Sequence, residues 1–261
     1  MTDHLPSTLV LERDGPVALL ALNRSEKRNA LDDATILGLA AFFRNLPDGV
    51  RAVVIHGHGD HFCAGLDLGE VTGEPDLFRG ILHSRMWHDA FHAIQFAAVP
   101  VFTVLHGAVV GGGFELAAAS HIRVAEASAY FALPEGQRGI FLGGGGSMRI
   151  PRLIGVPMVQ DLMLTGRTLS AEEGHRMGAA QYLVPAGQGR AKALELAHKA
   201  AGNARMTNYA VLQALPHIAE SSPEAGLFTE SLMAAVAEAT PEAQERLRAF
   251  LEKRAWKITP G

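Results

Sequence analysis

Two glycine-rich segments of this chain carry backbone groups that could bind a negatively charged atom. Residues 62–68 read FCAGLDL, and residues 107–117 read GAVVGGGFELA. Glycine lets the backbone approach a ligand closely, and the first N–H groups of a helix have no partner inside that helix. The helix dipole attracts negative charge to the same end. The segments therefore predict either an oxyanion hole, which needs two such donors, or tight packing of a strand against a helix.

Two other ligands of such segments are a phosphate and a metal ion. Neither G-x-x-x-x-G-K-[ST] nor G-x-G-x-x-G occurs in the chain, so the sequence lacks the common nucleotide-binding patterns. Residues 56–61, HGHGDH, fit the H-x-H-x-D-H signature of metallo-β-lactamase-like hydrolases, which bind zinc. Such hydrolases need further ligands downstream, and no later segment fits that need. We therefore interpret these residues as a polar loop and expect no metal site.

The hydrophobic periodicity predicts strands that alternate with helices, which is typical of an α/β fold. Strands are expected at residues 8–12, 17–22, 52–55, 101–105, 122–125 and 130–132, and helices at 32–45, 81–96 and 114–120. The glycines at 143–146 are expected to open another helix, which runs to about residue 154. Residues 69–80 show little periodicity. After residue 190 there is no strand candidate, and three or four helices are expected. We predict a core with the active site over residues 1–190 and a helical oligomerisation region over residues 191–261.

Bulk composition limits the classes of protein. Hydrophobic residues make up 48% of the chain and charged residues 19%, so a sizeable core can form. The net charge of −4 argues against binding to nucleic acid or to an anionic membrane, because both attract positively charged proteins. No apolar stretch is long enough to span a bilayer, and the N-terminus does not resemble a signal peptide. The single cysteine, Cys63, suits a reducing compartment, so we expect a cytoplasmic protein.

The ordered set of motifs resembles the enoyl-CoA hydratase/isomerase, or crotonase, superfamily. Its first signature is matched by residues 57–68, its second by residues 106–117 and its third by residues 134–149. An early loop, residues 23–31, and later segments at 164–167 and 171–174 match as well. The resemblance covers roughly residues 8 to 255, and the complete set is far more specific than any single motif.

This resemblance implies a fold, a substrate and an assembly. The fold would be a crotonase-like spiral of ββα repeats with a C-terminal helical region that forms a homotrimer or a dimer of trimers. The substrate would be an acyl-CoA thioester, with no separate cofactor. The backbone N–H groups of Ala64 and Gly112 would form the oxyanion hole. Further substrate-binding residues implied by the family are Arg24, Lys27, Ala30, Leu66, Asp67, Leu68, Gly111 and Gly143.

Glu115 and Glu135 match the two catalytic positions of those family members that are hydratases. Adding water across the 2,3 double bond of an enoyl-CoA needs a base for the water and a proton donor to the α-carbon, and two carboxyl groups beside one water can do both. We predict an enoyl-CoA hydratase of acyl-CoA metabolism in which Glu115 activates water and Glu135 transfers the proton. Because coupled carboxyl groups share protons, this division of roles stays open.

Other functions remain within the superfamily. A double-bond isomerase or a hydratase-lyase would use the same oxyanion hole. Some relatives bind RNA through a lysine-rich helix, but the helix at 32–45 carries Arg44 and no lysine. Leu142 replaces the proline that usually precedes the position of Gly143, which affects the expected shape of the acyl pocket. Trp87 and Phe91 share one helix face and are expected in the core or beside that pocket.

Overall fold

The computed structural model describes residues 5–71 and 76–254 of the chain. These residues divide into two compact units, and the boundary falls between Ala201 and Gly202. The first unit contains every strand and the last helix that packs on them. The expected functional division at residue 190 therefore falls inside the first unit and remains a prediction.

The main sheet of the first unit has six strands in the order β1-β2-β3-β4-β6-β9. The hairpin of β1 and β2 is antiparallel, and every following pair is parallel. The strands are β1 (Leu9–Asp14), β2 (Val17–Leu22), β3 (Ala52–Gly57), β4 (Val101–Leu105), β6 (Ile122–Glu126) and β9 (Tyr182–Val184). The predicted bounds of β2 and β4 are confirmed.

A smaller sheet lies beside the glycine-rich segments. Its strands are β5 (Ala108–Val110), β7 (Tyr130–Ala132) and β8 (Thr168–Ser170). A bridge between Cys63 and Val109 joins the first glycine-rich segment to β5. The succession of β4, β5 and α3 (Gly112–Ala119) gives one strand-strand-helix repeat, and the second glycine-rich segment forms its strand-to-helix turn.

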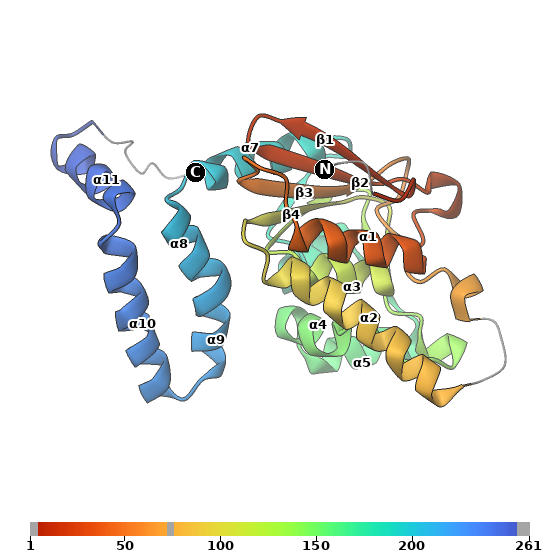
Figure 1. The fold of residues 1–261 in the computed structure, drawn as a ribbon. Coiled ribbons are helices and arrows are strands. Elements are labelled where there is room, and N and C mark those ends of the chain that lie inside the picture. The colour runs from red at the N-terminus through yellow and green to blue at the C-terminus, as the bar shows by residue number, and fades with distance from the viewer. Residues whose placement is uncertain (1–4, 72–75, 255–261) are drawn as a thin grey trace. The chain divides into compact units, whose positions relative to one another are not determined.

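Helices cover both faces of the main sheet, which explains why its central strands are largely apolar. On one face, α1 (Asp33–Arg44) and α2 (Leu77–Gln95) lie side by side, below the sheet in Figure 1. Val53 and Ile55 point into that larger core. Ala52 and Val54 point to the opposite core, which α7 (Gly189–Ala201) covers. The remaining regular elements of this unit are η1 (Ser25–Lys27), η2 (Leu68–Val71), η3 (Gly136–Arg138), α4 (Gly146–Ile154), α5 (Val156–Thr165) and α6 (Ala171–Met177).

Side-chain capping and backbone conformation set the first residues of α2 and α4. Helix α2 begins at Leu77 because the Asp76 side chain caps it by accepting from the Arg79 N–H at 3.0 Å. The predicted start at residue 81 was wrong because exposed apolar side chains, such as Phe78, obscure the amphipathic pattern. Helix α4 begins at Gly146, within the glycine run predicted to open it, because Gly145 has a φ of +88° and stands outside the helix.

The second unit is entirely helical over its described residues, as predicted. A π-helical turn (Ala210–Ala214) joins α8 (Arg205–Tyr209) to α9 (Leu215–Glu220), and α10 (Pro223–Glu238) and α11 (Pro241–Leu251) follow. Ser222 and Thr240 cap α10 and α11, each directly before a proline at the first helical position. No described helix is long and apolar enough to cross a membrane.

A glycine exchange tests how tightly α3 packs against residues 62–68. A Cβ atom on Gly113 would lie 2.4 Å from the Cys63 carbonyl oxygen, whereas a Cβ on Gly80 in α2 meets nothing within 4 Å. We expect Gly113→Ala to lower the free energy of unfolding by about 1–3 kcal/mol or more. The control, Gly80→Ala, should leave it unchanged or raise it by up to ~1 kcal/mol. Urea unfolding measures both, and equal stabilities would contradict the close packing.

Candidate active site

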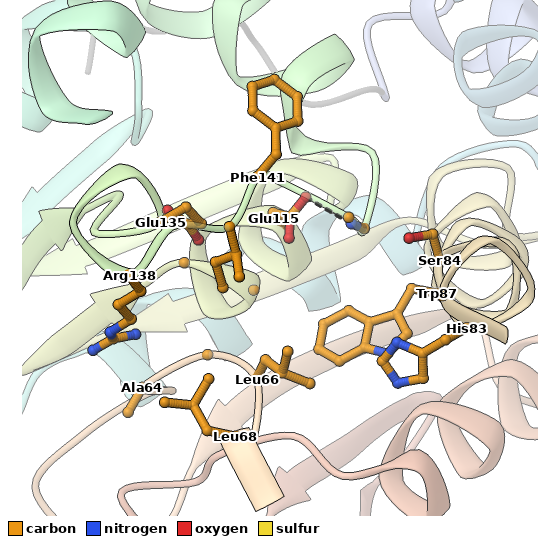
Figure 2. Close-up of a pocket in the computed structure, with 17 residues that line it drawn as sticks. Ala64, Leu66, Leu68, His83, Ser84, Trp87, Glu115, Glu135, Arg138 and Phe141 are labelled. Atoms are coloured by element: carbon orange, nitrogen blue, oxygen red, sulfur yellow. Dashed lines mark hydrogen bonds between the residues drawn. The ribbon is translucent and has the colours of Figure 1, made fainter. Parts of the chain in front are cut away.

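One cavity lies where the two glycine-rich segments meet α2 and residues 135–146 (Figure 2). Eight of the predicted site residues line it: Ala64, Leu66, Leu68, Gly111, Gly112, Glu115, Glu135 and Gly143. Four others, namely Arg24, Lys27, Ala30 and Asp67, are not among its lining residues. The cavity also has residues that sequence reasoning did not select, including His83, Ser84 and Arg138. Their only sequence signal was helical spacing on α2 or proximity to Glu135.

The backbone donors of the cavity differ from the predicted pair. The Ala64 N–H donates to the Arg28 carbonyl oxygen at 2.9 Å, so it is not free to bind a substrate oxygen. The assignment of Ala64 as an oxyanion donor is therefore corrected. The Leu66 N–H, by contrast, has no acceptor in the described part of the chain. A Cβ on Gly112 would lie only 3.4 Å from the Leu66 nitrogen, so these two backbones are close neighbours.

A short parallel bridge explains why Leu66 keeps a free donor. Leu31 donates its N–H to the Gly65 carbonyl at 2.8 Å and accepts from the Asp67 N–H at 2.8 Å. The groups flanking Leu66 are thus satisfied on one side, and the Leu66 N–H is directed to the other. Gly112 is the first residue of α3, where a helix leaves its N–H groups without internal partners. Its N–H also has no acceptor among residues 5–71 and 76–254.

Glu115 lies in the first turn of α3, and its side chain is buried, with only 3% exposed. Its Oε1 atom accepts from the Gly144 N–H at 2.9 Å and the Gly146 N–H at 2.7 Å. Burial raises the pKa of this carboxyl to about 7, and the nearby Glu135 adds to the rise, while the two N–H donors oppose it. Glu115 is therefore poised between its acid and base forms near neutral pH.

Residues 143–146, here called the glycine loop, include two positions where Glu115 occupies the space that a side chain would need. A Cβ on Gly144 would lie 3.1 Å from Glu115 Oε2, and a Cβ on Gly146 would lie 2.5 Å from Glu115 Cγ. The Gly143 N–H has no acceptor within the described residues, so it is available to a ligand beside Glu115. The glycine run thus serves close approach to a carboxylate, in addition to the backbone freedom expected from the sequence.

Glu135 directly precedes η3 and faces the same cavity as Glu115 (Figure 2). Its side chain is buried, and its Oε2 atom has no hydrogen-bond partner among the described residues. Burial raises its pKa, while the charge of Arg138 opposes that rise. These surroundings disfavour the ionised form of Glu135 relative to an exposed carboxyl group, because a buried carboxylate oxygen without a donor is poorly stabilised.

Apolar side chains form the rest of the wall. Trp87 of α2 is buried and meets Phe91 in an edge-to-face arrangement with ring centroids 5.5 Å apart. Of the two, Trp87 lines the cavity, together with Leu66, Leu68, Ile140 and Phe141. In Figure 2 the Trp87 indole and Leu66 face the two glutamates across the cavity. The site therefore combines two buried carboxyl groups with an apolar pocket and two adjacent backbone donors.

The comparisons with known proteins agree with this geometry. Residues 12–259 match the family model for enoyl-CoA hydratase/isomerase. The chain belongs to the enoyl-CoA hydratase/isomerase family. Enoyl-CoA hydratase EchA19 of Mycobacterium tuberculosis is 34% identical over 256 residues, which cover 96% of this chain and 95% of that protein. 2,3-Dehydroadipyl-CoA hydratase of Escherichia coli is 32% identical over 252 residues, with 95% and 97% covered.

Solved structures confirm the predicted fold. A crystal structure assigned provisionally to an enoyl-CoA hydratase of Rhodopseudomonas palustris is 58% identical, with a TM-score of 0.92 over 95% of this chain and 96% of that chain. Enoyl-CoA hydratase from Bacillus anthracis is 31% identical, with a TM-score of 0.88, and the match covers 95% of this chain and 97% of the other. The chain thus has the crotonase-like α/β spiral of ββα repeats with a C-terminal helical region.

In this enoyl-CoA hydratase/isomerase family member, the early loop is held by ion pairs outside the cavity. Arg24 Nη2 and Lys27 Nζ lie 2.8 Å and 2.9 Å from the same oxygen of Asp67. Arg24 also donates to the Ala30 carbonyl at 2.7 Å. The hydrogen bonds from Lys27 and Arg24 lower the pKa of Asp67 to about 2. This cluster ties the early loop to the segment that carries Leu66.

The histidine-rich stretch is engaged in loop contacts in this family member. His61 Nδ1 accepts from the Ala108 N–H at 3.1 Å, and His58 Nδ1 lies 2.9 Å from Asn23 Oδ1. Over the described residues, no three His, Cys, Asp or Glu side chains are grouped to hold a metal ion. Burial raises the pKa of Cys63 to about 12, so its thiol stays protonated and is a poor nucleophile.

The raised pKa of Glu115 makes the stability of the protein depend on pH. Between about pH 4.5 and 7, the folded state keeps a proton that the unfolded state releases, so this group destabilises the fold increasingly as pH rises. Glu115→Gln removes that cost. At about pH 8 the variant should be more stable than the parent protein by at most about 3 kcal/mol, since one pKa unit corresponds to ~1.4 kcal/mol. Urea unfolding at about pH 4.5 and about pH 8 measures the difference. An equal difference at both pH values would refute the assignment.

Proposed function

We propose that this chain is an enoyl-CoA hydratase that adds water across the 2,3 double bond of an enoyl-CoA thioester. The observation that carries this proposal is the pair of buried carboxyl groups, Glu115 and Glu135, facing one cavity with two backbone donors beside it. Family relatives of similar length are named as enoyl-CoA hydratases, which supports the same reaction. The substrate class is an acyl-CoA thioester, and coenzyme A enters as part of it.

The oxyanion hole consists of the Leu66 and Gly112 N–H groups. Attack of water oxygen at C3 forms a C–O bond and pushes the π electrons of the double bond through C2 onto the thioester oxygen. An enolate results, whose negative charge the two donors stabilise more strongly than the neutral carbonyl. The helix dipole of α3 adds to this stabilisation because Gly112 is its first residue.

The two glutamates move the protons. The Glu115 carboxylate takes a proton from the water as its oxygen attacks C3, and the Gly143 N–H helps to orient that water. The Glu135 carboxylic acid then delivers its proton to C2 as the enolate collapses back to a thioester. The product has gained one water, and exchange with solvent returns a proton from Glu115 to Glu135. The raised pKa values of both carboxyl groups suit these roles near neutral pH.

The remaining parts of the proposal concern binding and assembly. The coenzyme A moiety passes the early loop, where the half-exposed Lys27 amine offers positive charge for a phosphate. The helices of the second unit assemble a trimer or a dimer of trimers. Exposed large apolar side chains on those helices, among them Leu227, Phe228 and Phe250, support this role. A reduced, buried Cys63 is compatible with a cytoplasmic protein.

The reaction is tested by following loss of the conjugated enoyl-thioester absorbance, with mass spectrometry of the product. A panel of short, long and aromatic enoyl-CoA substrates defines the pocket. A gain of one water supports the hydratase. Unchanged mass from a non-conjugated enoyl-CoA would instead indicate an isomerase, and cleavage of the hydroxyacyl product a hydratase-lyase. No conversion of any thioester would contradict the proposal.

The two carboxyl groups are tested by amide substitution, which keeps their size. Glu115→Gln and Glu135→Gln should each lower kcat by ~100-fold or more while thioester binding persists. Replacing the exposed Glu172 by Gln removes the same charge far from the chemistry and should change kcat by less than about twofold. Full turnover in either site variant would remove that residue from the mechanism.

The corrected oxyanion pair is tested by replacing one backbone amide with an ester, which removes a single N–H and keeps the side chain. An ester at Leu66 should lower kcat by ~100-fold, the typical effect of losing one oxyanion donor. The matched ester at Ala64 removes the hydrogen bond to Arg28, so it should lower stability with much less effect on kcat. The opposite pattern would restore Ala64 as the donor.

A further inference from the structure

A buried arginine lies behind the glycine loop and has no part in the reaction proposed so far. Arg149 is in the first turn of α4, and only 7% of it is exposed. Arginine is rarely buried to this extent unless its donors are satisfied. Its Nη1 donates to the Gly144 carbonyl at 3.1 Å, and its Nε donates to Gln95 Oε1 at 2.7 Å. Arg149 therefore connects the glycine loop to the end of α2.

The far end of this connection is fixed to the main sheet. The Gln95 carbonyl accepts from His121 Nε2 at 2.9 Å, and His121 Nδ1 accepts from the Val101 N–H at 2.9 Å. Burial lowers the pKa of His121 to about 4, so the ring is neutral and carries its proton on Nε2, as these contacts require. Arg149 is thus anchored, through Gln95, to the beginning of β4.

The Arg149 guanidinium holds the glycine loop at the Gly144 carbonyl, between the two N–H groups that bind Glu115. The Gly144 carbonyl lies in the chain between the Gly144 and Gly146 N–H groups, both of which donate to Glu115. Four successive glycines allow many backbone conformations, and only a few present both donors to one carboxylate oxygen. A Cβ on Gly145 would lie 2.5 Å from Arg149 Nη1, so the guanidinium packs directly against the loop.

The charges around Glu115 give Arg149 a second effect. Glu135, directly before η3, disfavours the ionisation of Glu115 when Glu135 is itself ionised, whereas Arg149 favours it. His88 of α2 lies 3.7 Å from the Cβ position of Gly145, but burial lowers its pKa, so it carries little charge at neutral pH. Arg152 is on the same helix as Arg149, and its charge acts on Arg149. Arg149 is therefore a cation that favours the ionised form of Glu115.

We propose that Arg149 is a positioning residue for water activation: it selects the glycine-loop conformation that binds Glu115 and supplies the positive charge that favours the carboxylate. This inference rests on the proposed hydratase function. It assigns a role to a residue that contacts neither glutamate through a hydrogen bond. Replacing a purely structural arginine would lower stability alone. In the proposed role, replacing Arg149 also changes the pH at which the catalytic base ionises.

The test is the pH dependence of kcat for enoyl-CoA hydration, measured on purified, folded variants. Arg149→Gln removes the charge, and the base must then be ionised at higher pH. We expect kcat at about pH 7 to fall ~10- to 100-fold, the limb of rising activity to move up by about one pH unit, and KM to change by less than about threefold. Arg149→Lys keeps the charge, so its limb should stay in place while kcat falls ~10-fold.

Two further variants serve as control and reserve. Arg152→Gln removes a neighbouring exposed cation that donates to the Met148 carbonyl, and its kcat and pH limb should remain within about twofold and ~0.3 unit of the parent protein. Gln95→Leu removes the anchor of Arg149 and keeps the charge. If Arg149→Gln fails to fold, Gln95→Leu should still lower kcat at every pH without moving the limb.

The possible outcomes distinguish a failure of the proposed hydratase function from a failure of the role assigned to Arg149. A parent protein that hydrates no enoyl-CoA would overturn the proposed function itself. A parent protein that hydrates enoyl-CoA, together with an Arg149→Gln variant whose pH limb is unmoved, would overturn the role of Arg149. An unchanged kcat in Gln95→Leu would likewise overturn the anchoring path.

Discussion

The burial of one carboxyl group, that of Glu115, constrains much of this structure. A carboxylate removed from water needs compensating donors, and here two N–H groups of the glycine loop provide them. Those donors are too few to restore the ordinary pKa, so the group titrates near neutrality. Three parts of the surrounding fold hold Glu115 in this partly compensated environment. Helix α3 presents Glu115, the loop encloses it, and Arg149 fixes the loop.

Glycine has a different physical reason at each position around the site. At Gly112 a Cβ would lie 2.7 Å from the Trp87 ring, and at Gly113 it would collide with the Cys63 carbonyl. At Gly144 and Gly146 the space belongs to Glu115. Glycine is thus required in two distant segments because a side chain would collide with a neighbour in each. In one segment the neighbours are Trp87 and Cys63, and in the other the neighbour is Glu115. A glycine-rich motif in a sequence shows this close packing without showing which neighbour requires it.

Much of the fold and part of the site could be predicted from the sequence. Strands such as Val101–Leu105 are largely apolar runs buried on both faces, so local composition determines them. The two glutamates were found because their spacing matches a family pattern. The oxyanion donor was misassigned to Ala64, because the availability of an N–H depends on partners far away in sequence. Arg28 engages Ala64, and the Leu31 bridge leaves Leu66 free. No pattern local to residues 62–68 distinguishes these two amides.

The same limit explains why Arg149 did not stand out as functional. In the sequence it is one basic residue of a motif, and its position there does not reveal which groups it contacts. Its significance comes from three contacts that the fold alone brings together: a carbonyl in the glycine loop, a side chain at the end of α2 and, through that residue, a neutral histidine beside the sheet. The hydrogen-bond partners of Arg149 are neutral, so they do not neutralise the positive charge of the guanidinium group, and that charge can act on a nearby group. Here that neighbour is a buried acid, so the network stabilises the ionised form of Glu115 from a distance.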